Sequence, residues 1–131
     1  MTLEKLTRLR RLILDILLGA QEPVKAYDIL ELARERGQRL TASSVYRVLE
    51  YLEAQGLIHR VNALNAYMAC LEGPQKHNPL IVICSRCQKT QEIFDETLAN
   101  SIFQRLSSLG LGLSAASVEI RGLCPQCAPE A

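Results

Sequence analysis

Four of the five cysteines fall into two Cys-x-x-Cys pairs, the feature that most constrains the fold. The pairs are Cys84 with Cys87 and Cys124 with Cys127, with residues 88–123 between them. Each pair presents two sulfurs at a tight turn, and two such turns complete a closed four-thiolate zinc site. The segment between them exceeds the ~15–20 residues of a compact zinc ribbon and has room for a strand, a helix and a strand. We therefore predict a structural zinc bound by these four cysteines.

The cellular compartment bears on whether such pairs bind metal. No apolar run approaches the ~18–20 residues of a membrane span, and no apolar signal-peptide core follows the charged start MTLEKLTRLRR. We expect a cytoplasmic protein with no membrane partner, in which paired thiols are metal ligands or redox groups rather than structural disulfides. A thioredoxin-type dithiol is the alternative, but neither pair has the βαβ context of that motif.

The first half of the chain carries the pattern of three helices. The second covers roughly 26–36, and the third follows Thr41, a good N-cap. Gly37 and Gly56 are expected to end these two helices. The residues expected to face the core are Leu6, Leu9, Ile13, Leu14, Leu17, Ala26, Ile29, Leu30, Ala33, Val45, Val48, Leu49 and Leu52.

Two strand-like runs follow, over 57–61 and 66–70, and the Asn-Ala-Leu-Asn turn between them predicts a hairpin. Three helices and then a hairpin is the order of a winged helix-turn-helix. We assign this DNA-binding domain to residues 1–72. Glycine and proline breakers predict a hinge linker over 73–79.

Residues 80–131 are predicted to form a small α/β domain, so the fold class is α+β. Its strands are expected at LIVIC, TQEIF and ASVEIR, with a helix opening at Asp95. About 50 residues are too few to be stable on a core alone, so a metal or a partner subunit is expected to support them. The helix residues expected to be buried are Leu98, Ile102, Leu106 and Leu109.

Cys70 is left over from the two pairs. The two histidines of the chain, His59 and His77, flank it, and Glu92 lies on a later strand. Two imidazoles, a thiolate and a carboxylate form a plausible tetrahedral zinc set. The rival carboxylates are Asp95 and Glu96. The alternative is that Cys70 is a small buried hydrophobe, and chemistry alone leaves both interpretations open.

The stretch SSVYRVLEYLEAQGLIHRV, with AYDIL upstream and the two Cys-x-x-Cys pairs downstream, resembles the ferric uptake regulator family of bacterial metal-sensing repressors. The resemblance covers nearly the whole chain and is strongest to the zinc uptake regulators. Iron regulators carry several histidines where this chain reads GPQKHNP. The resemblance implies a regulatory zinc bound by His59, Cys70, His77 and Glu92, and therefore two zinc ions per chain.

The same resemblance implies a homodimer that binds a double-stranded DNA operator, with residues 80–131 as the zinc-containing dimerisation domain. It assigns Tyr27 and Arg47 to the DNA contact. We also expect contacts from Tyr46, which lies beside Arg47, and from Ser43 and Ser44 at the start of the third helix. The net charge of +1 is weak for a DNA-binding protein, so local placement must decide. The arginines that can frame the third helix are Arg8, Arg10, Arg11, Arg34, Arg36, Arg39, Arg47 and Arg60.

The chain departs from the family pattern in two places near the DNA contact. Lys25 stands where a capping Ser or Thr is common, and Ser43 and Ser44 replace a more usual Pro-Thr pair. The His-rich C-terminal tail of some zinc regulators is absent from this sequence. We expect the serine pair to shift the base preference.

These observations predict a zinc-responsive transcriptional repressor of zinc-uptake genes. No catalytic triad, phosphate loop or acid pair stands out, and the closed ligand sets leave zinc no open position for a water. We therefore expect neither catalysis nor a small-molecule substrate. The alternatives are an iron- or manganese-sensing regulator of the same fold, a thiol redox protein and a zinc-ribbon adaptor that binds protein.

Overall fold

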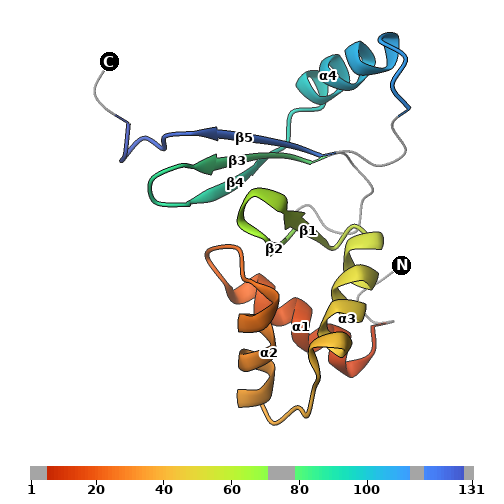
Figure 1. The fold of residues 1–131 in the computed structure, drawn as a ribbon, viewed down its shortest axis with the longest axis vertical. Coiled ribbons are helices and arrows are strands. Elements are labelled where there is room, and N and C mark those ends of the chain that lie inside the picture. Colours follow the sequence, from red (N-terminus) through yellow and green to blue (C-terminus); the bar gives the residue numbers. More distant parts are fainter. Residues whose placement is uncertain (1–5, 71–78, 113–116, 129–131) are drawn as a thin grey trace. The chain divides into compact units, whose positions relative to one another are not determined.

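The computed structural model describes residues 6–70, 79–112 and 117–128 (Figure 1). The chain divides into two compact units, Met1–His77 and Asn78–Ala131, each with its own sheet. Most of the expected linker over 73–79 lies outside the described residues, and the finer domain boundaries stay predictions. No helix in the described ranges is long and apolar enough to cross a membrane.

The first unit contains the three expected helices. They are α1 (Arg8–Gly19), α2 (Ala26–Glu35) and α3 (Ala42–Ala54). The hydroxyl oxygen of Thr41 accepts from the backbone N–H of Ser44, which confirms the expected N-cap. Lys25 precedes α2 and provides no side-chain cap. Gly37 and Gly56 have positive φ angles of 86° and 74°, as expected of glycines that end helices.

The three helices enclose the core of the first unit. Leu49 and Leu52 of α3 are 1% and 0% exposed. Leu6 and Leu9, which are expected in the core, are only partly buried against it. The remaining helix residues of this core are Ile13, Leu14, Leu17, Ala26, Ile29, Leu30, Val45 and Val48. The helical spacing of apolar residues therefore predicted this core nearly in full.

The expected hairpin is present and consists of β1 (Ile58–Val61) and β2 (Ala66–Ala69). A short 3-10 turn joins the strands and ends at Asn65, whose φ is 50°. Tyr67 also exchanges two backbone hydrogen bonds of 2.8 and 2.9 Å with Val24, which ties the hairpin to the segment before α2. This arrangement of three helices and a hairpin is a winged helix-turn-helix.

The second unit is built around a central strand. Its elements are β3 (Leu80–Cys84), β4 (Thr90–Ile93), α4 (Glu96–Ser108) and β5 (Val118–Gly122). β3 pairs antiparallel with β4 and parallel with β5 (Figure 1). The Asp95 carboxylate accepts from the backbone N–H of Leu98 at 2.9 Å, which confirms the expected start of α4.

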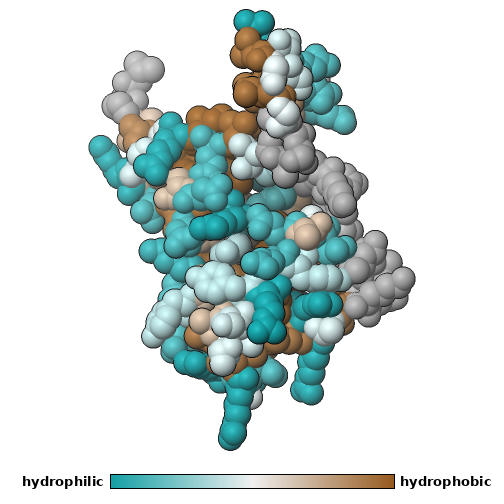
Figure 2. Space-filling model, turned by 45° about the vertical axis from the view of Figure 1, so that its right-hand side comes forward, coloured by the Kyte–Doolittle hydropathy of each residue, from teal (hydrophilic) through white to brown (hydrophobic). Residues whose placement is uncertain are grey.

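The expectation that α4 buries its apolar stripe is wrong for this single chain. No residue of α4 is buried, and Leu98 and the following Leu109 are 43% and 62% exposed. Hydrophobic side chains are visible among hydrophilic ones on this helix at the top of Figure 2. Helical periodicity identifies an apolar stripe but not the surface that covers it, which is why the sequence misled here.

Two leucine-to-alanine substitutions, one in the core of the first unit and one at its surface, test the assignment of the core. Leu52→Ala should lower the free energy of unfolding by about 2–5 kcal/mol, because it removes packed atoms and leaves a cavity. Leu32→Ala, at a position 37% exposed on α2, should cost about 0.5 kcal/mol or less. Urea unfolding followed by helical circular dichroism measures both. Equal losses would contradict the assignment of Leu52 to the core.

Candidate metal centres and DNA-facing surface

The second sheet brings the two Cys-x-x-Cys turns together. β3 ends at Cys84, and its parallel register places Cys84 beside Gly122, the last residue of β5. The carbonyl of Gly122 accepts from the N–H of Ser85 at 2.8 Å, which extends the pairing into the first turn. Because parallel strands end on the same side of a sheet, Cys124 lies next to the first turn. The expectation that the two turns meet is confirmed.

The four thiols have the geometry of a zinc site. The sulfurs of Cys84, Cys87, Cys124 and Cys127 all lie within 4.8 Å of one another. The Sγ atoms of Cys87 and Cys124 are 3.7 Å apart. Two sulfurs on a zinc tetrahedron with Zn–S bonds of about 2.3 Å are about 3.8 Å apart. The donors therefore fit zinc, and four converging thiols favour a metal over two separate redox dithiols.

The thiols also perturb one another's ionisation. The backbone N–H groups of Cys87 and Cys124 lower the pKa of Cys84 to about 5. The neighbouring Cys124 side chain and burial raise the pKa of Cys127 to about 12. Such opposed shifts are expected when several thiols are too crowded to ionise together. A divalent cation would remove this conflict, because metal-bound thiols are deprotonated.

Backbone hydrogen bonds shape both turns. In the first, the N–H of Gln88 donates to the Cys84 carbonyl at 2.9 Å, and the N–H of Cys87 points to the Cys84 sulfur at 3.4 Å. Gln88 adopts a left-handed conformation with φ of 63°, which is unusual for a residue other than glycine. In the second, the N–H groups of Cys127 and Ala128 both donate to the Cys124 carbonyl. No signal in the sequence indicates the left-handed conformation of Gln88.

The structure describes three of the four residues expected at the regulatory site, and their role as zinc ligands stays a prediction. His59 lies on β1, and Cys70 follows β2 and donates its N–H to the Leu57 carbonyl at 2.9 Å. The ligand atoms of His59 and Cys70 lie within 4.8 Å of each other, and both residues are buried. Glu92 lies on β4 opposite Ile81 in the second unit. His77 lies outside the described residues.

One more potential donor shares the hairpin with His59 and Cys70. Met68 is the direct cross-strand partner of His59 and precedes Cys70 by two positions. The Met-Ala-Cys sequence signals this residue, because alternation along an extended chain would put Met68 and Cys70 on one face. Of the carboxylates considered as rivals to Glu92, Asp95 is occupied as the N-cap of α4.

The residues expected to contact DNA lie on the exposed surface of α2 and α3. Tyr46 is 49% exposed on α3, and Tyr27 is 70% exposed in the first turn of α2. Ser43 and Arg47 are also exposed. Ser44 differs, because its hydroxyl lies 3.1 Å from the hydroxyl of the capping Thr41 and is therefore engaged at the start of the helix.

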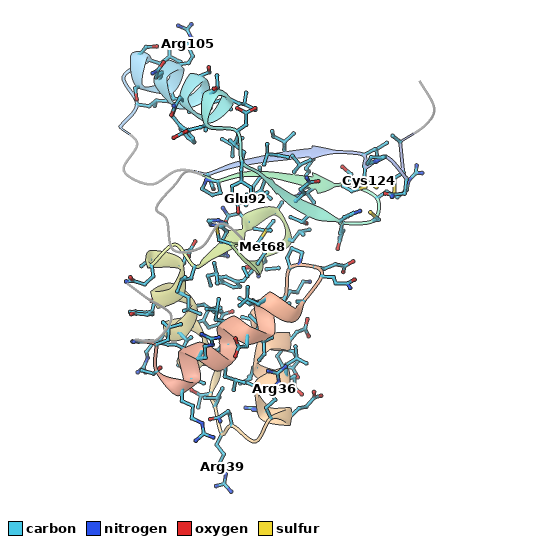
Figure 3. All side chains as sticks on the ribbon, turned by 180° about the vertical axis from the view of Figure 1, so that it is seen from behind. Arg36, Arg39, Met68, Glu92, Arg105 and Cys124 are labelled. Atoms are coloured by element: carbon cyan, nitrogen blue, oxygen red, sulfur yellow. The ribbon has the colours of Figure 1, made fainter. Side chains whose placement is uncertain are left out.

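Intramolecular contacts sort the arginines expected around α3. Arg10 lies over the ring of Tyr51 at 3.6 Å, and Arg60 donates to Asn65 at 2.7 Å. Arg11 and Arg34 pair with the carboxylates of Asp15 and Glu31 on their own helices. Arg36 and Arg39 extend outward near the end of α2 in Figure 3. Part of the cationic surface expected for DNA is therefore engaged in contacts within the first unit.

The thiol cluster yields a metal-content prediction. Cys84→Ser should abolish tight zinc binding at the second unit, because it removes the buried member of the four-thiol set. Cys70→Ser is the matched control and should retain that zinc, since Cys70 belongs to the hairpin. Elemental analysis of protein dialysed against a chelator measures the metal content. Unchanged zinc in Cys84→Ser would refute the site.

Comparison with known proteins places the chain in one family. The model of the Ferric uptake regulator family matches residues 3–121. The zinc uptake regulation protein of Escherichia coli (strain K12) is 32% identical over 105 residues, 79% of this chain. The match spans only 61% of that relative's length. The zinc uptake regulation protein of Mycobacterium tuberculosis (strain H37Rv) is 25% identical over 124 residues, 92% of each chain.

Solved structures agree with this assignment. The crystal structure of holo XcZur matches with a TM-score of 0.82 and 33% identity, covering 92% of this chain and 84% of the other. A zinc uptake regulator complexed with zinc and DNA matches with a TM-score of 0.83 and 30% identity, covering 93% and 82%. The chain therefore belongs to the Ferric uptake regulator family.

Proposed function

We propose that this protein is a zinc-responsive, DNA-binding transcriptional repressor that acts in the cytoplasm. The observation that carries the proposal is the buried pair of His59 and Cys70 on the hairpin that directly follows α3. Such a pair offers an imidazole and a thiolate, two ligands that zinc prefers, next to the helix expected in the DNA groove. The relatives named for zinc uptake regulation and the structure solved with zinc and DNA support it.

Cys70 favours zinc over the iron- or manganese-sensing alternative. The iron-sensing alternative has some support from a relative named for ferric uptake regulation. The ferric uptake regulation protein of Legionella pneumophila is 28% identical over 93 residues, which cover 71% of this chain and 68% of the Legionella protein. Thiolate ligands suit zinc, whereas manganese and magnesium prefer oxygen donors. A thiolate within reach of an imidazole therefore biases the hairpin toward zinc.

The exposed stripe of α4 supports a homodimer formed through the second unit. Exposed apolar residues of this unit include Phe94, Leu98, Leu109, Ile120 and Leu123. A unit this small buries little surface of its own, so a second copy is a suitable cover for the stripe. The four-thiol zinc would hold the two turns of each unit together. Dimerisation would then present two copies of α3 to DNA.

The proposed mechanism couples zinc to the spacing of the two α3 helices. His59 and Cys70 would bind the regulatory zinc from the hairpin, and the family resemblance adds His77 from the linker and Glu92 from the second unit. Zinc held by these residues would restrict the hinge. Together with the zinc of the four thiols, this gives two zinc ions per chain. Helices of a dimer must match major grooves about 34–36 Å apart. A coupling of about 1–3 kcal/mol would suffice to favour the DNA-bound state.

In this proposal Arg47 and Tyr46 read the major groove from α3, and Tyr27 contacts DNA from α2. Arginine can bind guanine through two hydrogen bonds, and phosphate contacts from other arginines would position the helix. Zinc-import genes are the targets that the family resemblance implies.

The role of Cys70 is tested by one conservative substitution. Cys70→Ser should weaken the second zinc and the zinc-dependent gain in DNA affinity, because serine replaces a soft ligand by a hydroxyl. The four-thiol zinc and the dimer should remain. If Cys70 is only a buried hydrophobe, the variant should instead lose about 1–3 kcal/mol of stability. Its zinc response would then be normal. The melting temperature and the zinc dependence of DNA binding are both measured on one sample. Lower stability with a normal zinc response would refute the proposed site.

The DNA contact is tested by an arginine pair. Arg47→Ala should weaken specific binding by about 1–3 kcal/mol, with a penalty that depends on DNA sequence, if Arg47 reads a base. Arg105→Ala, on the last turn of α4, is the matched control and should leave the affinity unchanged. Fluorescence anisotropy with a duplex selected from a random pool measures both. No loss in Arg47→Ala would contradict the assignment of α3 as the recognition helix.

A further inference from the structure

The hairpin presents three potential metal donors on one face. The register places Met68 of β2 directly opposite His59. Cys70 follows the end of β2, two positions after Met68, and its ligand atom lies within 4.8 Å of that of His59. Directly opposite residues have Cβ atoms about 4.5–5.5 Å apart, and residues two apart share a strand face. Because methionine is long and flexible, its sulfur can approach the neighbouring imidazole and thiol.

This donor face is distinct from the face that packs on the helices. Ile58, Tyr67 and Ala69 belong to the helical core, as the alternation along both strands requires. The donor face carries His59, Met68 and Cys70, together with the small buried residues Val61 and Ala66. Met68 is only half-buried and remains accessible to an entering ion. The thioether is therefore not needed as filler of the helical core.

We infer that His59, Met68 and Cys70 form a binding site for copper(I), which competes there with zinc. This inference rests on the proposed function in one respect, which is that copper(I) and the regulatory zinc would both bind His59 and Cys70. Soft thiolate and thioether ligands suit copper(I). The protein ligands that zinc ordinarily uses are Cys, His, Asp and Glu, and methionine is not among them. Met68 thus adds a donor that distinguishes the two ions.

When only the three hairpin donors bind the ion, charge balance favours copper(I) over zinc. A copper(I) ion with one thiolate and two neutral donors forms a neutral complex, which suits a buried face. A zinc ion with the same donors keeps a positive charge and needs a further carboxylate, the role proposed for Glu92. Copper(I) therefore requires no ligand from the linker or the second unit. It would occupy the hairpin without restricting the hinge and would oppose zinc-dependent DNA binding.

A methionine-specific signal tests this site in the intact chain. The sequence contains two methionines, Met1 and Met68, so labelling with ¹³C-methyl methionine gives two signals. The chain carrying its four-thiol zinc is titrated anaerobically with copper(I) buffered by bicinchoninate. The Met68 signal should shift and saturate, and the Met1 signal should not move. A Met68 signal that does not respond would overturn the inference, whatever copper binds at the other thiols.

Two variants give the affinity comparison. Met68→Leu conserves volume and should weaken copper(I) binding at the hairpin by at least about tenfold, with zinc affinity unchanged. Leu32→Met adds a third signal on α2 as a matched control, and this signal should not respond to copper. Copper(I) affinity equal to that of the parent in Met68→Leu would also overturn the inference. Failure of the proposed function is a separate result. In that case the second zinc would not bind, or its binding would not change the affinity for DNA.

Discussion

The parallel pairing of β3 with β5 is the constraint on which the second unit depends. Each Cys-x-x-Cys turn alone supplies two sulfurs, which do not close a zinc site. Parallel strands end on the same side of a sheet, so the turn after Cys84 and the turn after Gly122 must meet. A parallel connection needs a crossover of a dozen or more residues, which explains the long separation between the two pairs. The metal in turn would stabilise a sheet that buries little surface.

The same geometric logic operates in the hairpin of the first unit. Alternation along two short strands sends Ile58 and Tyr67 into the helical core and places His59 and Met68 on the opposite face. Core packing therefore fixes the orientation of the donor face without involving the donors themselves. A substitution that keeps the core can change metal chemistry independently of the fold. This separation makes the hairpin a suitable place for metal sensing.

Sequence patterns predicted the elements that local rules govern. The caps at Thr41 and Asp95, the stops at Gly37 and Gly56, and the β3 strand are found where they were expected. The four-thiol cluster could also be predicted, because Cys-x-x-Cys spacing dictates turn geometry. These features depend on residues near one another in the chain, which is why the sequence alone was informative.

Other features depend on contacts that a pattern does not specify. The apolar stripe of α4 was recognised, but its exposure was not, because periodicity does not say what covers a helix. The strained turn at Gln88 carries no residue signal, and Met68 gains its significance only from the cross-strand register. The set of His59, Cys70, His77 and Glu92 still rests on family resemblance for two of its members.

The central claim is that zinc at a second site controls DNA affinity. It is tested most directly by comparing the chain with one zinc and with two zinc ions per chain on the same selected duplex. The account predicts that the second zinc tightens DNA binding by about 5–150-fold, as expected for a coupling of about 1–3 kcal/mol. Equal affinity of the two forms for that duplex would contradict it.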